Sequence, residues 1–193
     1  MEQLKAIGYN ITVDSTPFFQ VTPQKRIRFL TTRLVGNMYA LQSLIDDVFK
    51  DSSNITCTVM IGYITDGFTK PIFYRIGLHR FFYITNWREI YVRNVDVECT
   101  FIYAMFRNVS KEEIYCYCKA NIFSHTSAYI FFHNEHRLFY VSTDVIDIVT
   151  QNEEIIRQLK ERYVDLYDRR YEANRTNQLR LDVIVSRFFS GLL

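Results

Sequence analysis

The feature that most constrains the fold is an alternation of apolar and polar residues that runs, with short breaks, from residue 54 to residue 142. Successive residues of a strand point to opposite faces of a sheet, so a period of two predicts strands. The Asp66-Gly67 dipeptide lies between two such runs, and this pair is a strong signal for a tight hairpin. Polar turns are expected near residues 66–67, 86–88, 107–112 and 133–136.

The number and order of these segments predict an antiparallel sheet. About eight strands follow one another through short turns, and sequential hairpins produce an antiparallel meander. A sheet of this size with few glycines curls, so that it either approaches a closed barrel or wraps around a helix. We favour a strongly bent sheet with a helix in its concavity, and barrel-like closure is the alternative.

A long helix is predicted over residues 23–50, before the sheet. Thr22 is suited to the N-cap and Pro23 to the first helical position. Apolar residues recur at helical spacing: Ile27, Leu30, Leu34, Leu41, Leu44 and Val48. Asn37 interrupts this stripe, which fits two arrangements. We favour the core-facing side of a helix on the sheet, and the alternative is the seam of a dimeric coiled coil whose register Asn37 fixes.

The last fifty residues return to a helical pattern. Thr150 and Glu153 have the spacing of a capping box. The apolar residues that follow fall on one helix face: Ile155, Leu159, Tyr163 and Leu166. Residues 179–189 fit either a strand or a helix, and we favour the helix.

The predicted class is therefore α+β, with a single domain over residues 1–193. Its parts are an extended lead-in over 1–22, a helix over 23–50, an antiparallel meander over 54–142 and a helical region over 143–193.

Several catalytic chemistries have no motif in this chain. Phosphate-binding loops need clustered glycines, whereas the six glycines here are scattered. Neither a G-x-S-x-G elbow nor an H-E-x-x-H metal site occurs. His133 and His136 bracket a polar turn, either as a metal or proton-transfer pair or as two ordinary surface histidines. We expect a non-enzymatic protein with no cofactor and no metal; a hydrolase or nuclease without a recognised motif is the third interpretation.

The interpretation of the cysteines depends on the strand assignment. Cys116 and Cys118 are two positions apart, so on a strand both face one side of the sheet, where Cys99 of a neighbouring strand can approach Cys118. Together with Cys57, they are expected to be buried as small apolar residues. The alternatives are a zinc site and a disulfide.

Basic and aromatic residues suggest a nucleic-acid interface. Lys25, Arg26, Arg28 and Arg33 crowd the start of the first predicted helix, where the helix dipole also favours an anion. Other arginines lie among aromatic residues, as in proteins that stack single-stranded bases. The residues expected on that second surface are Tyr74, Arg75, Arg80, Trp87, Arg88, Tyr91 and Arg93. Because the net charge is only +2, single-stranded RNA binding is the alternative function and not the leading one.

The leading interpretation is a protein that binds other proteins or itself. Aromatic residues make up 16% of the chain, more than the inner face of one sheet is expected to bury. On a strand, residues 112–123 have apolar side chains on both faces, which helices or a partner must cover. The residues expected at the interface are Tyr115, Tyr117, Phe123, Phe188, Phe189 and Leu192. They predict a subunit of a homo-oligomer or of a larger assembly.

Origin and location are expected from composition and from the start of the chain. An excess of Phe, Tyr, Ile and Asn over Gly, Ala and Pro is typical of AT-rich genomes, such as those of many viruses. Met1 is not followed by a cationic and apolar leader, and no apolar run approaches the roughly 18 residues that span a bilayer. We therefore expect an intracellular protein, of the cytoplasm or the nucleus.

Overall fold

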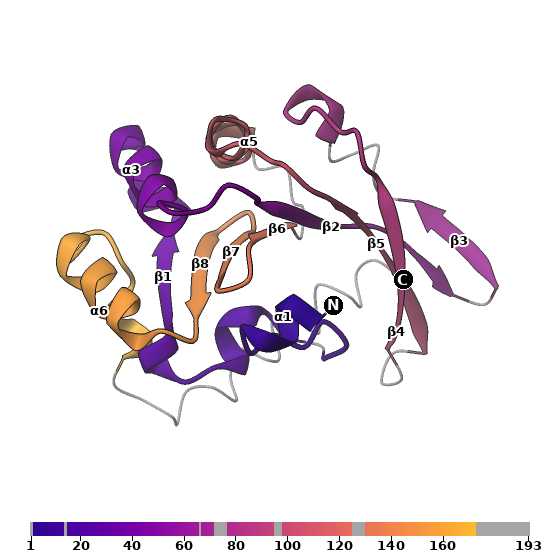
Figure 1. Cartoon of the computed structure of the whole chain (residues 1–193), viewed down its shortest axis with the longest axis horizontal. Helices are drawn as coiled ribbons and strands as arrows, with labels where there is room; N and C mark the ends of the chain where they lie inside the picture. Colours follow the sequence, from indigo (N-terminus) through magenta and orange to yellow (C-terminus); the bar gives the residue numbers. More distant parts are fainter. Residues whose placement is uncertain are drawn as a thin grey trace.

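The computed structural model describes residues 2–13, 15–65, 67–71, 77–94, 98–124 and 130–172. Within them, eight antiparallel strands form one sheet in the order β1-β8-β7-β6-β2-β5-β4, and β3 pairs with β2 beside this path (Figure 1). The predicted α+β class and antiparallel sheet are confirmed.

The bounds of the elements are as follows. The strands are β1 (Arg26–Leu30), β2 (Thr56–Thr65), β3 (Phe68–Pro71), β4 (Arg88–Asn94), β5 (Cys99–Phe106), β6 (Ile130–His133), β7 (Arg137–Val141) and β8 (Val145–Thr150). The α-helices are α1 (Glu2–Ala6), α2 (Thr31–Leu34), α3 (Met38–Val48), α5 (Lys111–Ser124) and α6 (Glu153–Arg162). Short 3₁₀ helices are η1 (Pro17–Gln20), η2 (Pro23–Lys25), η3 (Leu78–Arg80) and η4 (Arg169–Tyr171).

Strand β2 joins the two halves of the sheet. One of its edges pairs with β5 along most of its ten residues. Its other edge pairs first with β6 and then with β3. The register against β5 shifts between Met60 and Gly62, and a bulge of this kind increases the local twist of a sheet.

The sheet is neither a simple meander nor a barrel. After β5 the chain forms helix α5, and β6 then pairs with β2 and not with β5. The strand order begins at β1 and ends at β4, so the sheet is not closed and the alternative of barrel-like closure is wrong.

Two of the four predicted turns join strands. Thr65 pairs with Phe68 across residues 66–67, and His133 pairs with Leu138 in the β6–β7 hairpin. The other two predicted turns do not, because residues 77–87 contain no strand and α5 begins directly after the turn that follows β5.

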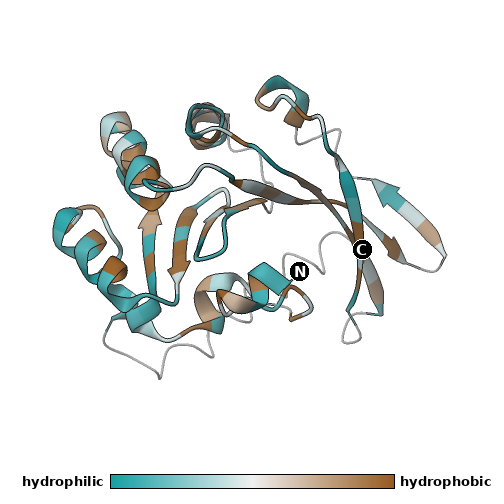
Figure 2. Ribbon diagram, in the orientation of Figure 1, coloured by the Kyte–Doolittle hydropathy of each residue, from teal (hydrophilic) through white to brown (hydrophobic). Residues whose placement is uncertain are grey.

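The sheet separates two apolar layers. Helices α3, α5 and α6 contribute to one core with strand residues such as Val59 and Phe139. The N-terminal segment covers the opposite face, where Ile7 and Tyr9 join Phe131 in a second core and the Tyr9 and Phe131 rings meet edge to face at 5.4 Å. Figure 1 shows α3 and α5 on one side of the sheet and α1 on the other, and Figure 2 shows hydrophobic residues concentrated on the strands between them.

The predicted helix over residues 23–50 is wrong for its first half. Residues 26–30 form β1, whose Ile27 and Phe29 belong to the helical-side core while Arg26 and Arg28 face the N-terminal segment. The alternation of arginine and apolar residues fits a strand as well as the apolar spacing fits a helix. All five residues pair with β8, and this pairing stabilises the strand.

Asn37 starts helix α3 and does not fix the register of a coiled coil. It is the N-cap, and its Oδ1 accepts a hydrogen bond from the Ala40 N–H at 3.0 Å. Leu41, Leu44 and Val48 are fully buried in the core beneath α3. The second half of the predicted helix is therefore confirmed as a core helix on the sheet.

Residues 111–124 form helix α5 and not the predicted strand. Ile114, Cys118 and Ile122 recur every four residues and are buried, which is the spacing of one helix face. Ser110 and Glu113 form a reciprocal cap. The Ser110 hydroxyl accepts from the Glu113 N–H at 3.1 Å, and the Glu113 carboxylate accepts from the Ser110 N–H at 2.7 Å.

The predictions for the two ends of the chain are partly right. The expected extended lead-in over residues 1–22 contains α1 and η1. Residues 145–150 form a strand. The N-cap of α6 is Asn152 and not Thr150, because the Asn152 Oδ1 accepts a hydrogen bond from the Glu154 N–H at 3.0 Å. Helix α6 itself is confirmed. Residues 179–189 lie outside the described part of the chain.

The helical assignment of α5 makes a prediction about thiol reactivity. All four cysteines are free; Cys116 is exposed, whereas Cys57, Cys99 and Cys118 are buried. Burial raises the pKa of these three buried thiols. We expect one thiol to react with Ellman's reagent in the native protein and all four after denaturation. Cys116→Ser should abolish the native reaction; a fast native reaction that persists in this variant would contradict the assignment, because a strand presents Cys116 and Cys118 alike.

Candidate interaction surface at the open edge of the sheet

The two edge strands at the ends of the strand order, β1 and β4, differ in what contacts their outer sides. At the β1 end, the segment after α6 covers the outer edge, where the Asp168 N–H donates to the Arg28 carbonyl at 2.7 Å and Tyr167 forms a bridge with Phe29. At the other end, β4 pairs with β5 at all seven positions, and no other described strand pairs with it. An edge strand of this kind offers backbone donors and acceptors to another chain.

Arg28, one of the predicted site residues, is buried at the β1 end. It forms a bidentate ion pair with Asp147 of β8, with Nε–Oδ1 and Nη2–Oδ2 distances of 2.6 and 2.7 Å. The two side chains are 7% and 0% exposed, and the guanidinium lies 4.1 Å from the centroid of the Phe18 ring. Burial raises the pKa of Asp147, and the contact with Arg28 opposes that shift. The pair links β1 to β8, and the Phe18 ring of the N-terminal segment packs on its guanidinium.

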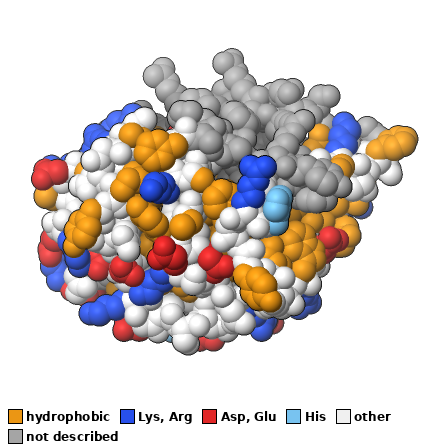
Figure 3. Space-filling view, turned by 90° about the horizontal axis from the view of Figure 1, so that it is seen from above, with side chains coloured by type: hydrophobic (Ala, Val, Ile, Leu, Met, Phe, Trp, Pro, Cys, Tyr) orange, Lys and Arg blue, Asp and Glu red, His pale blue; other side chains and the backbone are white. Residues whose placement is uncertain are grey.

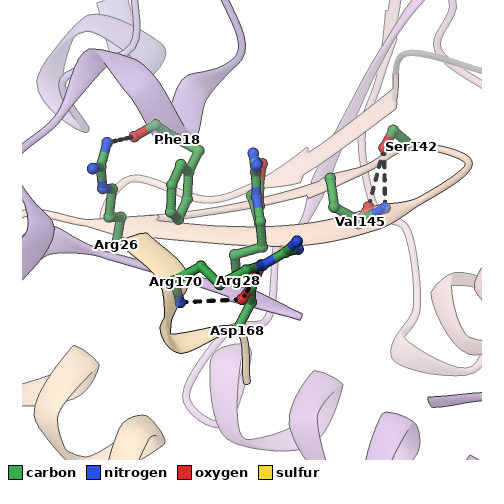
Figure 4. Close-up of polar contacts among 8 residues, drawn as sticks. Phe18, Arg26, Arg28, Ser142, Val145, Asp168 and Arg170 are labelled. Atoms are coloured by element: carbon green, nitrogen blue, oxygen red, sulfur yellow. Dashed lines mark hydrogen bonds and ion pairs between the residues drawn. The ribbon is translucent and has the colours of Figure 1, made fainter. Parts of the chain in front are cut away.

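Arg26 makes similar contacts two residues earlier in β1. Its guanidinium is 4.2 Å from the Phe18 ring centroid, and its Nη1 donates to the Phe18 carbonyl at 2.5 Å. Burial lowers the pKa of Arg26, and the nearby charge of Arg28 lowers it further. Figure 4 shows the contact between Arg26 and Phe18 and, near Arg28, the pair between Arg170 and Asp168.

Lys25 and Arg33 also have partners within the fold. The Lys25 ammonium donates to Gln151 Oε1 at 2.7 Å, and Arg33 Nη1 donates to the Tyr167 carbonyl at 3.0 Å. The helix N-terminus on which the predicted anion site rested does not exist at these residues, because residues 26–30 are a strand. The four cations instead tie β1 and its flanks to neighbouring segments.

A small cavity lies beside this cluster. Its volume of about 10 Å³ is near the minimum that holds one water molecule. Cations and carboxylates line it together: Arg26, Arg28, Lys160, Asp168 and Glu172. Lys160 pairs with Glu172 at 2.9 Å. This balance of charge is typical of a structural polar network and does not favour a free anion.

The strongest candidate for a binding surface lies at the opposite end of the sheet. Glu89, Tyr91 and Arg93 share one face of β4, because they alternate with residues that pack toward the N-terminal layer. Trp87 precedes the strand on the same face, where it stacks on Phe106 of the helical-side core. We call Trp87, Glu89, Tyr91 and Arg93 the β4 surface.

The β4 surface carries two partly exposed aromatic rings. Trp87 is 42% exposed and Tyr91 is 58% exposed. The Trp87 and Phe106 rings are nearly parallel, with centroids 6.3 Å apart. Glu89 accepts a hydrogen bond from the Trp87 Nε1–H at 3.3 Å and another from the Tyr91 hydroxyl at 3.0 Å, which raises the pKa of Tyr91. These hydrogen bonds orient both rings at the surface.

The predicted arginine–aromatic surface is assembled in part. Arg93 lies beside Tyr91 on the β4 surface, but Arg88 is five positions away and therefore faces the opposite side of the strand. Arg80 is exposed on η3. None of these three arginines forms an ion pair with another described residue. Two further predicted residues lie outside the described part of the chain: Tyr74 and Arg75.

Three of the residues predicted at a protein interface are described, and they do not form one exposed face. All three belong to α5: Tyr117 is buried on its inner side, Tyr115 is half-buried and Phe123 is 56% exposed. Three further predicted residues fall outside the described ranges: Phe188, Phe189 and Leu192.

Sequence reasoning did not single out Asp147 or Glu89. Asp147 is a lone acid in the apolar run V-I-D-I-V, and an isolated charge in a buried strand is the available signal for a buried ion pair. Glu89 alternates with Trp87 and Tyr91, which is the available signal that the three share a face.

The turn histidines have different environments. His133 is 1% exposed, its Nε2 lies 3.1 Å from the Thr58 hydroxyl, and burial lowers its pKa to about 4. His136 is exposed. Among the described residues, no group of three or more His, Cys, Asp or Glu side chains is placed to hold a metal ion. Nor is any described helix long and apolar enough to cross a bilayer.

Comparison with protein-family models, with characterised proteins and with solved structures found no match. The function must therefore be inferred from the geometry of this fold.

Removing one partner of the buried ion pair should destabilise the fold strongly. We expect Asp147→Ala to lower the free energy of unfolding by about 3–5 kcal/mol, because Arg28 stays buried without its counter-charge. The double variant R28M/D147L removes both charges and should lose less. Urea denaturation gives the free energy of unfolding of the wild type and of both variants. The control is Glu154→Ala, which removes an exposed ion pair and should have a much smaller effect. Equal small losses for Asp147→Ala and Glu154→Ala would contradict a structural role of the buried pair.

Proposed function

We propose that this chain is a non-enzymatic assembly protein that binds a protein partner at the open edge of β4. One observation carries the proposal: β4 ends the strand order without a described strand on its outer side, and its face displays the partly exposed rings of Trp87 and Tyr91. An open edge can pair with an extended strand of a partner. Aromatic residues and Arg are enriched at the centres of protein interfaces.

A comparison with β3 supports this choice of edge. Natural edge strands are commonly blunted by Pro, by Lys, by a bulge or by short length. Strand β3 has only four residues and contains Lys70 and Pro71. Strand β4 has seven residues with neither Pro nor Lys, and it pairs with β5 in unbroken register. Of the two strands, β4 is thus the better template for an added strand.

The distribution of charge favours a protein over a nucleic acid. Glu89 lies between Trp87 and Tyr91, and its carboxylate repels phosphate. Arg93 is the one cation of the β4 surface, since Arg88 faces the other side of the strand. Figure 3 shows cationic and anionic side chains interspersed on the face seen from above. The neighbouring Arg93 and Tyr91 keep single-stranded RNA as the second candidate.

The proposal places the protein inside the cell. Its four free cysteines, with Cys116 exposed, support this location, because the cytosol and the nucleus keep thiols reduced.

Site-specific photo-crosslinking separates a protein partner from RNA. A benzophenone amino acid at Tyr91 should form covalent adducts in the expressing cell that resist ribonuclease and are sensitive to protease. The matched control carries the same probe at Tyr39 of α3, which is 81% exposed but distant from β4 in the fold. We expect several-fold more protein adduct from position 91. Ribonuclease-sensitive adducts at position 91, or equal yields at both positions, would overturn the proposal.

A further inference from the structure

We infer that the β4 edge joins a second copy of this chain, with the two β4 strands antiparallel around a two-fold axis at Tyr91. The inference rests on the proposed function and names its partner. The strand reads R-E-I-Y-V-R-N from residue 88 to residue 94, so Tyr91 is its central residue. A two-fold axis brings the same surface of both copies together, and an edge strand that pairs with its own copy meets this condition.

The register centred on Tyr91 matches charge with opposite charge and apolar with apolar side chains. Glu89 then lies opposite Arg93 of the second copy, and Ile90 lies opposite Val92 of the second copy. Each pair occurs twice because of the symmetry. Directly opposed pairs of opposite charge or of β-branched residues stabilise antiparallel strands, whereas like charges destabilise them.

Neighbouring registers lose this match. An axis on either adjacent residue places a charged residue, Glu89 or Arg93, opposite Tyr91. An axis midway between Tyr91 and the residue before it places Arg88 opposite Arg93 of the second copy, which sets like charges against each other. Moving the axis by half a residue slips the register between the two strands by one residue. Such a slip exchanges the two faces of a strand, so the second sheet would be turned over. The Tyr91 axis keeps both helical layers on the same side.

Glu89 and Arg93 have no charged cross-strand partner in their own sheet. Across β5, Glu89 lies opposite Ala104 and Arg93 lies opposite Thr100. Neither forms an ion pair with another described residue. Glu89 accepts two hydrogen bonds within the β4 surface, and a carboxylate has room for more. A second copy supplies the missing opposite charge to both residues.

The Tyr91 axis joins the two eight-stranded sheets into one continuous sheet. It also brings the two half-exposed Tyr91 rings together at the centre of the contact. Aromatic side chains at the centre of an interface contribute strongly to binding.

Charge reversal at positions 89 and 93 tests this register. The wild-type chain should show a mass twice its 23.1 kDa by light scattering and by sedimentation equilibrium. Glu89→Arg sets Arg against Arg, and Arg93→Glu sets Glu against Glu, so each variant should weaken the dimer roughly thirty-fold. The double variant E89R/R93E restores opposite charges and should recover most of the affinity. Arg80→Glu, an exposed charge reversal outside β4, should leave the dimer unchanged.

Mixing the two single variants gives a sharper outcome that a folding defect cannot imitate. Glu89→Arg carries Arg at both positions, and Arg93→Glu carries Glu at both, so the mixed dimer has two favourable pairs. At a concentration a few times the wild-type dissociation constant, we expect each variant to be largely monomeric alone and the equimolar mixture to dimerise. A mixture that stays monomeric, or single variants that dimerise like the wild type, would overturn the Tyr91 register.

A cysteine probe locates the axis directly. In a Cys116→Ser background, which removes the exposed native thiol, Tyr91→Cys should form a disulfide-linked dimer under mild oxidation with copper phenanthroline. Tyr39→Cys, on exposed α3, should not. Equal crosslinking of both variants would count against the axis.

The results separate this inference from the proposed function. A monomeric wild-type chain whose position-91 probe still crosslinks to another protein overturns the inference and leaves the proposed function standing. A monomeric chain without protein adducts overturns both.

Discussion

The architecture depends on the ten residues of β2, because this strand pairs with members of both halves of the sheet. Its first residues bind β6 and thereby the strands that lead to β1. Its last residues bind β3 and the far part of β5. The bulge between Met60 and Gly62 lies where β2 passes from one half to the other, and it adds twist at that point. In Figure 1 the β3–β4–β5 end extends beyond α3 and α6, so the face of β4 is left without their cover.

The two ends of the strand order consequently have different surroundings. At the β1 end, the Arg28–Asp147 pair links β1 to β8, the Phe18 ring packs on the Arg28 guanidinium, and the Asp168 N–H ties the segment after α6 to β1. A buried charge without its partner is costly, so the pair favours this alignment of β1 and β8. At the β4 end, the polar groups face outward: Glu89 orients Trp87 and Tyr91, and its charge complements Arg93 along the same face. Backbone contacts like those of Tyr167 and Asp168 with β1 are not seen at β4 in the described part of the chain. We therefore expect a partner at β4.

Sequence reasoning predicted the antiparallel sheet and the hairpin at Asp66-Gly67 because both depend on local signals, a period of two and a turn dipeptide. It failed at residues 26–30, where Ile27 and Phe29 fit a helix stripe and a strand equally well, and pairing with β8 decided the outcome. It failed at α5 because alternating Tyr and Cys imitate a strand, although the Ser110–Glu113 capping box was available. Trp87, Tyr91 and Arg93 were singled out because arginines recur among aromatic residues, but the position of β4 at the end of the described strands follows from strand order, which no local pattern encodes.

Amide hydrogen exchange measured over a range of protein concentrations tests most directly whether copies of this chain join at β4. The exchange of outward-facing amides in residues 88–94 should slow markedly when the concentration is raised about a hundredfold, because strand addition gives these N–H groups acceptors. Amides of β3, the short edge strand with Lys70 and Pro71, should keep the same rates. Exchange in β4 that is independent of concentration, and as fast as in β3, would contradict the account.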